Sequence, residues 1–524
     1  MHIRLMRLED YSRVYQLWLS CKGMGLNDLD DSPEGIERYL RRNPETCFVA
    51  QEDGRIIGVI LSGHDGRRGF IHHTIQRSGA APAPMRSVPS WNKVWRNNMS
   101  EYQLETKCIQ SGYVPGNSEP RTLPIYQSTT YKYDDADALG QLFDLKAEGH
   151  MYSRISNPTL AAVEEKLSDL EGGVGAMLVS SGQSANLLAV FNICSAGQNL
   201  IAMNNIYGGT INLLSVTMKR MGIEVRYINE KMSDAEIEGL FDENTRMVFG
   251  ETIANPALMV FDISRFAAIA HRHQVPLVVD NTFATPYLCR PFEHGADIVT
   301  HSTSKYMDGH ANVLGGVVID GGCFDWEASG KFPELTTPDE SYHGVVYTKQ
   351  FGKAAYVTKA RVQLLRDFGC TMAPISAYLL NLGLESMALR VKKHSENALE
   401  VAKFLETQPQ VLWVNYPKLA SSPYYALAEK YLPEGASGVV SFGVRGGREA
   451  AMKLMNSLRL AQIVVHVADA RTCVLHPAST THRQLTDQQL KDSGIGPEFI
   501  RFSVGIEDVR DIIADLKQAL EQLD

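Results

Sequence analysis

Short apolar runs alternate with amphipathic segments through the middle of this 524-residue chain. The runs at 176–180, 199–203, 245–251 and 276–279 have the length of buried strands, and helical spacing of apolar residues separates them. This alternation is typical of an α/β fold, in which helices cover both faces of a mostly parallel sheet. Ligands of such sheets lie at the carboxyl ends of the strands, so the polar residues that follow each run are the first candidates for a site.

Two of these strand ends carry an acid and an amine. Residues 276–279 lead into Asp280, and residues 296–299 lead through a hydroxyl-rich segment, 301–304, to Lys305. Pyridoxal phosphate (PLP) requires a lysine for its Schiff base and an anionic partner for its pyridinium nitrogen. The pair therefore suits PLP, although an ordinary buried ion pair uses the same residue types.

A turn of small residues follows the run at 176–180. Ser181-Gly182-Gln183 leads into an expected helix at 184–194. Such a turn forms an anion site because glycine admits a ligand, while the amides and dipole of the helix N-terminus stabilise its charge. The same turn also occurs for packing alone. In chain order, the strand ends supply these candidate ligand groups: Gly182, Tyr207, Glu251 or Asn255, Asp280 and Lys305.

Length and composition narrow the class of protein. A chain this long predicts roughly two to four domains. The net charge of -9 argues against non-specific nucleic-acid binding, and no apolar run reaches the length of about 20 residues that spans a bilayer. The eight cysteines are scattered without a C-x-x-C pair, which indicates a reducing, cytoplasmic setting. His394, His476 and His482 lack zinc-site spacing, so no metal is expected.

The first 75 residues have the pattern of a small α/β unit. A helix with Val14, Leu17 and Trp18 on one face precedes two strand-like runs joined at Asp53-Gly54, a strong hairpin signal. This arrangement resembles the front half of a GNAT-family acetyltransferase. The Gln/Arg-x-x-Gly-x-Gly/Ala loop that holds acetyl-CoA in that family does not follow. We therefore expect residues 1–75 to be a partial GNAT-like fragment without acetyltransferase activity.

Residues 76–98 contain Pro, Gly and Ser in the proportion of a linker. Met99-Ser100-Glu101 then has the pattern of a natural start. A gene fusion and a merged reading frame ahead of a complete enzyme both produce this organisation, and the sequence does not separate them.

From about residue 100 onward the chain resembles one family. The motifs that carry the resemblance are YSRISNPT, SSGQSA, YGGT, ETIANP, VVDNTFATPYLCRP, HSTSKY, NLGLES, LHPASTTH and RFSVGIED. Their order and spacing are similar to those of the Cys/Met-metabolism PLP enzymes. The resemblance implies PLP fold type I, which is aspartate-aminotransferase-like. It also implies an N-terminal arm and first helix at 99–160, a large PLP-binding domain at 161–360 and a small α+β domain at 361–524.

The resemblance assigns roles around the cofactor ring. Lys305 would carry the cofactor and move protons, and Asp280 would keep the pyridinium nitrogen protonated. Tyr207 would stack on the ring and assist proton transfer, and Asn255 would lie near O3′. Lys305 and Tyr207 are therefore the catalytic candidates.

The resemblance also implies anion-binding residues and an assembly. Phosphate would be held by the backbone of Gly182 and Gln183 and by the hydroxyls of Ser302 and Ser304. Tyr152 and Arg154 would reach the phosphate of a neighbouring subunit, so the site would need at least a dimer. A homotetramer built from such dimers is expected. Arg501 would clamp the substrate α-carboxylate.

The segment at 465–472, VHVADART, decides between branches of the family. With the LHPASTTH motif that follows, it resembles the O-acetylhomoserine sulfhydrylase branch, in which Asn often stands at the position of His466. The branch implies γ-replacement on O-acetyl-L-homoserine by sulfide or methanethiol, giving homocysteine or methionine and acetate. Methionine or cystathionine γ-lyase and cystathionine γ-synthase remain alternatives, because they share the cofactor residues. A non-catalytic binding protein would require loss of Lys305 or Asp280.

Overall fold

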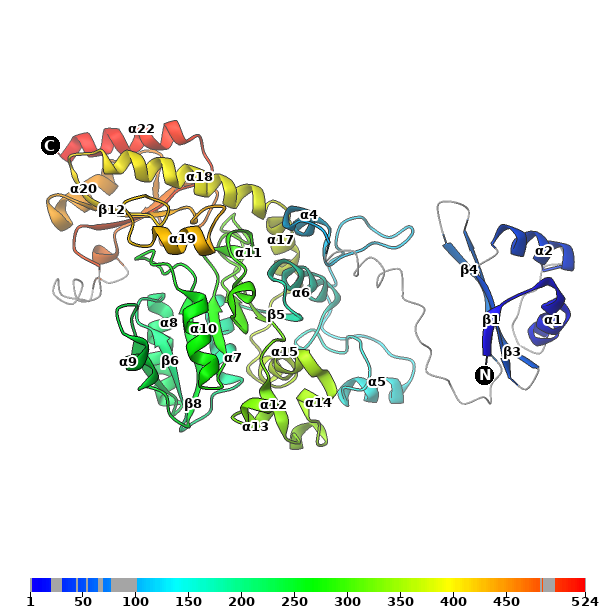
Figure 1. Ribbon diagram of the computed structural model, residues 1–524. Coiled ribbons are helices and arrows are strands. Elements are labelled where there is room, and N and C mark those ends of the chain that lie inside the picture. Colours follow the sequence, from blue (N-terminus) through cyan, green and yellow to red (C-terminus); the bar gives the residue numbers. More distant parts are fainter. Residues whose placement is uncertain are drawn as a thin grey trace. The chain divides into compact units, whose positions relative to one another are not determined.

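The computed structural model describes residues 2–19, 31–43, 46–52, 55–64, 69–76, 101–480, 483 and 495–523. The chain divides into two compact units, Met1–Lys93 and Val94–Asp524 (Figure 1). Among the described residues, no helix is both long enough and apolar enough to cross a membrane.

In its described residues, the first unit has a four-stranded antiparallel sheet and two α-helices. Its elements are β1 (His2–Leu5), α1 (Tyr11–Leu19), α2 (Pro33–Arg42), β2 (Cys47–Glu52), β3 (Arg55–His64) and β4 (Gly69–Gln76). Val14, Leu17 and Trp18 of α1 are buried, as the helical face predicted. Glu52 pairs with Arg55 across the expected hairpin. The turn at Asp53-Gly54 lies outside the described residues, and so does the expected linker apart from Gln76.

The core of the second unit is a seven-stranded sheet. In spatial order its strands are β5 (Gly175–Val179), β11 (Gly316–Asp320), β10 (Ile298–His301), β9 (Leu277–Asp280), β8 (Thr245–Glu251), β6 (Asn199–Met203) and β7 (Glu224–Ile228). Among the described residues, β11 pairs antiparallel with β5 and β10, and the other four strand pairs are parallel, so the prediction of a mostly parallel sheet is confirmed. Strands β9 and β10 are adjacent and parallel, which brings their carboxyl ends to one edge.

Helices cover both faces of this sheet (Figure 1). Helix α6 (Pro158–Glu171) begins after its N-cap Asn157, whose side chain accepts a hydrogen bond from the Thr159 amide at 2.9 Å. Helix α7 (Gly182–Phe191) begins two residues earlier than expected, because Ser181 is its N-cap and accepts from the Ser184 amide. The first turn of α7 therefore lies at the end of β5.

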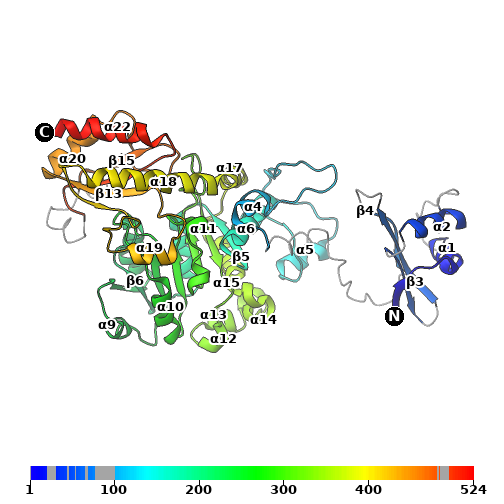
Figure 2. The same ribbon diagram turned by 45° about the horizontal axis from the view of Figure 1, so that its top comes forward.

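The C-terminal part forms a smaller domain around a second sheet, as predicted. The strand order is β12 (Val411–Asn415), β13 (Val439–Val444), β16 (Phe499–Ser503), β15 (Cys473–Leu475) and β14 (Gln462–Ile463). Helices α18 (Met387–Glu406) and α22 (Val509–Leu520) lie side by side, and α18 packs against β12 and β13 (Figure 2).

One helical prediction needs correction. The pattern predicts a single helical segment over 375–405, whereas the structure has α17 (Pro374–Glu385) and α18, with a break at Ser386. The guanidinium of Arg390 donates to the Gly383 carbonyl at 2.6 Å and so satisfies the end of α17. Gly383 also lies against the backbone of Asp308, since an added Cβ would be 2.5 Å from the Asp308 oxygen. The break thus fits α17 against the loop that carries Lys305.

Candidate functional site

Asp280 ends β9 with its carboxylate held by fixed donors. Its Oδ1 accepts from the amide of Thr282 at 3.0 Å and from the Thr282 hydroxyl. Its Oδ2 accepts from the Asn186 side chain at 3.2 Å, and the Thr300 hydroxyl orients that amide by donating to it at 2.6 Å. No ion pair of the described residues involves Asp280 or Lys305. The buried ion pair left open by the sequence is therefore not formed, and the carboxylate is available to a cationic ligand atom.

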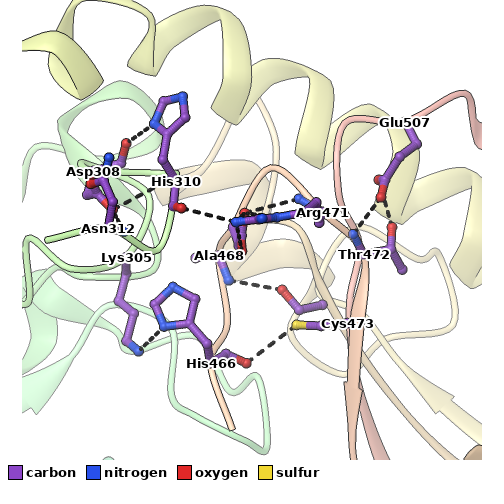
Figure 3. Close-up of polar contacts among 12 residues, drawn as sticks. Lys305, Asp308, His310, Asn312, His466, Ala468, Arg471, Thr472, Cys473 and Glu507 are labelled. Atoms are coloured by element: carbon purple, nitrogen blue, oxygen red, sulfur yellow. Dashed lines mark hydrogen bonds and ion pairs between the residues drawn. The ribbon is translucent and has the colours of Figure 1, made fainter. Parts of the chain in front are cut away.

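Lys305 lies in the loop that follows β10, at the same edge of the sheet. Its amine is 3.3 Å from Nδ1 of His466, a residue 161 positions further along the chain (Figure 3). Burial, together with the Arg501 guanidinium, lowers the pKa of Lys305 to about 8. An appreciable fraction of this amine is thus uncharged near neutral pH, and it can act as a nucleophile or a base.

A narrow space, the Gly182 cradle, lies between the start of α7 and Ser302. A Cβ added to Gly182 would be 2.6 Å from the Cβ of Ser302, so only glycine permits this approach. The side-chain oxygen of Gln183 is buried and has no hydrogen-bond partner among the described residues. Ser304 is buried, and its hydroxyl accepts from the Gly315 amide at 2.9 Å. The amides at this helix start, beside the Ser302 side chain, have the chemistry of an anion site.

Glu251, at the end of β8, connects two loops of the site. One carboxyl oxygen accepts from the Tyr207 amide at 2.7 Å, and the other accepts from the Asn255 amide at 3.4 Å. Glu251 is paired with Asp280 in the sheet. Burial, together with the neighbouring Asp280, raises the pKa of Glu251 well above its usual range. The ring of Tyr207 itself remains about half exposed, at 49%.

Replacing Glu251 with glutamine is expected to misplace Tyr207. The amide NH₂ of glutamine cannot accept a hydrogen bond, so one of the two backbone N–H groups loses its acceptor. The loss of one such hydrogen bond corresponds to about a tenfold loss of kcat/KM. Steady-state kinetics of E251Q should be measured beside E243Q, which changes an exposed glutamate just before the same strand. Equal kinetics of the two variants would show that Glu251 does not position the site.

Arg501 of β16 joins the C-terminal domain to this edge of the large sheet. Its guanidinium donates to the carbonyls of Val465 and His466 at 3.0 and 3.2 Å, and it lies 3.5 Å from the Asn255 side-chain oxygen. Arg501 is 7% exposed, and its Nε has no partner among the described residues. A buried guanidinium with a free donor is suited to binding a carboxylate.

Tyr152 and Arg154 lie apart from these residues in the single chain. The Arg154 guanidinium lies 5.4 Å from the centroid of the Tyr152 ring, and Tyr152 is 40% exposed. In the part of the chain that the structure describes, neither side chain forms a hydrogen bond with another predicted site residue. The structure thus brings together the predicted residues from Gly182 to Arg501 and leaves this pair outward.

Two contacts of the site were not predicted from the sequence. Asn186 supports Asp280 from one turn into α7, and the only signal for it was a polar residue within an apolar helical stretch. His466 was noted only as part of the variable segment at 465–472. Its approach to Lys305 depends on tertiary contacts and has no periodic signal.

The sequence matches the family model described as Cys/Met metabolism PLP-dependent enzyme over residues 105–521. It is 42% identical to the O-acetyl-L-homoserine sulfhydrylase of Leptospira meyeri, covering 83% of this chain and 99% of that protein. It is 44% identical to the homocysteine synthase of Schizosaccharomyces pombe, covering 80% and 98%.

A solved structure from Campylobacter jejuni has a similar fold. It is assigned as an O-acetylhomoserine (thiol)-lyase and carries N'-pyridoxyl-lysine-5'-monophosphate. The TM-score is 0.77 at 38% identity, and the match covers 80% of this chain and 100% of that one. Residues 1–104 lie outside the region matched by the family model.

Proposed function

Since this chain belongs to the Cys/Met metabolism family of PLP-dependent enzymes, we propose that it catalyses γ-replacement on O-acetyl-L-homoserine. Sulfide or methanethiol displaces acetate, and homocysteine or methionine is formed. The similarity to sulfhydrylases and homocysteine synthases over 98–99% of their length carries this proposal. The reaction belongs to the biosynthesis of sulfur-containing amino acids.

The described residues fit PLP. Lys305 supplies an amine, Asp280 supplies a carboxylate without a protein cation, and Gly182 opens the helix N-terminus to a phosphate. Gln183, Ser302 and Ser304 would complete the phosphate contacts, and Asn255 and Tyr207 would border the ring. When bound, PLP supplies an electron sink that makes the protons at Cα and Cβ of the substrate acidic enough to remove.

Three protein residues have separate roles in the reaction. Arg501 binds the α-carboxylate and so fixes which face of Cα is turned toward the base. Lys305 accepts the protons given up at Cα and Cβ, and its lowered pKa suits that role near neutral pH. Tyr207, which is half exposed at the site, assists proton transfer.

The protein is also proposed to form a homotetramer in the cytoplasm. The outward position of Tyr152 and Arg154 supports their use by a neighbouring subunit, in a homotetramer built from active dimers. The scattered free cysteines support a cytoplasmic setting.

Product analysis tests the reaction. O-acetyl-L-homoserine should be supplied with and without sulfide, and homocysteine, acetate and 2-oxobutanoate should be measured. We expect homocysteine and acetate in equal amounts when sulfide is present. Release of 2-oxobutanoate at an undiminished rate in the presence of sulfide would instead indicate a γ-lyase. O-succinyl-L-homoserine serves as the comparison ester for cystathionine γ-synthase activity.

Removal of residues 1–98 is expected to leave kcat/KM unchanged within about twofold, because the second unit has a hydrophobic core of its own. All proposed site residues belong to the unit Val94–Asp524, and the family match begins at residue 105. The measurement compares the full chain with a chain starting at Met99. A large loss of kcat/KM, with an unchanged unfolding midpoint, would show that the GNAT-like fragment contributes to catalysis.

A further inference from the structure

The imidazole of His466 has two different nitrogen environments. Nδ1 lies 3.3 Å from the amine of Lys305. Figure 3 shows the two side chains pointing toward each other. Nε2 is buried and has no hydrogen-bond partner among the described residues. One nitrogen of the ring is therefore engaged with the proposed base, and the other is left unpaired inside the protein.

The segment around His466 is held in place independently of Lys305. The carbonyl of His466 accepts from Arg501 at 3.2 Å, and the Ala468 amide donates to the Ser503 hydroxyl at 3.0 Å. The Ala470 amide donates to the carbonyl of Gly309, in the loop that carries Lys305, also at 3.0 Å. These bonds fix the backbone that carries the ring next to the loop of Lys305.

Burial and the surrounding positive charges keep the imidazole neutral. Lys305, Arg501 and Arg471 face the ring with positive charge, and Asp469 is its one acidic neighbour among the groups that act on it. Burial, followed by the influence of Lys305, lowers the pKa of His466 to about 4. Lys305 in turn faces Arg501 and the thiol of Cys473. A neutral imidazole carries one proton, on either Nδ1 or Nε2.

The two neutral tautomers of His466 differ in free energy, because they leave different buried atoms without a hydrogen-bond partner. With the proton on Nε2, a buried N–H would lack an acceptor, which is rare in folded proteins. With the proton on Nδ1, that N–H donates to the lone pair of the uncharged Lys305 amine, and only the Nε2 lone pair lacks a partner among the described residues, which is less unusual than an orphaned N–H. The second arrangement uses the only polar contact that the ring side chain makes among the described residues.

We propose that His466 is a positioning residue for Lys305: its Nδ1–H donates to the uncharged amine and holds it in the form that accepts a proton. The inference rests on the proposed function, because Lys305 is the base there. His466 occupies the position at which Asn is common in the sulfhydrylase branch, and this role would explain why a different residue is tolerated there. An asparagine amide can supply a similar donor, whereas an aliphatic side chain cannot.

The test compares H466L and H466N with the unmodified full-length protein. After removal of the cofactor by amine exchange, Lys305 is labelled with an amine-reactive reagent over a pH series, and its labelling rate is followed by peptide mass spectrometry. Only the uncharged amine reacts, so the midpoint reports the pKa of Lys305. We expect H466L to raise this midpoint by roughly half a unit to one unit, the equivalent of one hydrogen bond. H466N should stay close to the unmodified protein.

In the cofactor-loaded enzyme, the acidic limb of the pH profile of kcat should move upward by a similar amount in H466L and remain in place in H466N. A lower or unchanged labelling midpoint in H466L overturns the proposal, because His466 would then accept from the charged amine or not act on it. If H466L does not fold, a shifted midpoint in H466N overturns it equally. Absence of homocysteine production by the unmodified enzyme refutes the proposed function but leaves the labelling result interpretable.

Discussion

Replacing Lys305 with alanine is expected to lower the rate of homocysteine formation by about 10³-fold or more. The change removes both the amine that would hold the cofactor and the base that would accept protons from the substrate, and each role alone contributes at least about a hundredfold. Fold and stability should change little, because the amine forms no ion pair and only one hydrogen bond, with His466, among the described residues. Initial rates with saturating O-acetyl-L-homoserine and sulfide measure the effect.

Two controls separate this chemical role from a structural one. K349A removes an exposed lysine from the same unit and should retain full activity. Added methylamine should restore part of the activity of K305A, since a small amine can enter the space left by the side chain and accept protons. Activity of K305A within tenfold of the unmodified enzyme would remove Lys305 from the mechanism.

Replacing Asp280 with asparagine is expected to lower the same rate by about 10²–10³-fold, the usual effect of removing one preorganised electrostatic group. Asparagine keeps an oxygen for the Thr282 donors but presents a neutral NH₂ toward the Asn186 side chain, which is also a donor. A neutral group at this position cannot keep a pyridinium nitrogen protonated, so the electron sink weakens. Steady-state kinetics and the visible absorption of the bound cofactor report the change.

The matched control is D234N, which alters a half-exposed aspartate whose surface ion pair with Arg265 should contribute little. D280N should retain the cofactor at high concentration, because the cradle at Gly182 is unaltered. If D280N keeps activity within threefold, the carboxylate is not the partner of the ring nitrogen.

The sheet was predictable where local signals agree with the tertiary structure. Apolar runs ending in Asp280 and at 296–299 identified β9 and β10, and the spacing of polar residues after them placed Asp280 and Lys305 at one edge. Strand β11 was not among the predicted runs, and a short strand such as Gly316–Asp320 does not encode in its sequence whether its neighbours run parallel. The break at Ser386 was missed because apolar periodicity continues across it, and it depends on contacts from Arg390 and Asp308.

The site was predictable to a similar extent. Motifs near strand ends identified most of the proposed cofactor contacts, whereas the supporting residues required the folded chain. Glu251 serves its two loops through backbone amides, which leave no sequence pattern. His466 reaches Lys305 because the Ala470 amide binds the Gly309 carbonyl, a contact between segments 161 residues apart.

Reductive trapping of the cofactor tests most directly whether Lys305 is the residue that carries PLP. The purified full-length protein is reduced with borohydride, which fixes a lysine-bound cofactor irreversibly, and is then digested and analysed by peptide mass spectrometry. We predict the pyridoxyl phosphate mass on the peptide that contains Lys305 and on no other lysine peptide, with the label absent from K305A. A label on a different lysine, or none in a protein that still forms homocysteine, would contradict the account.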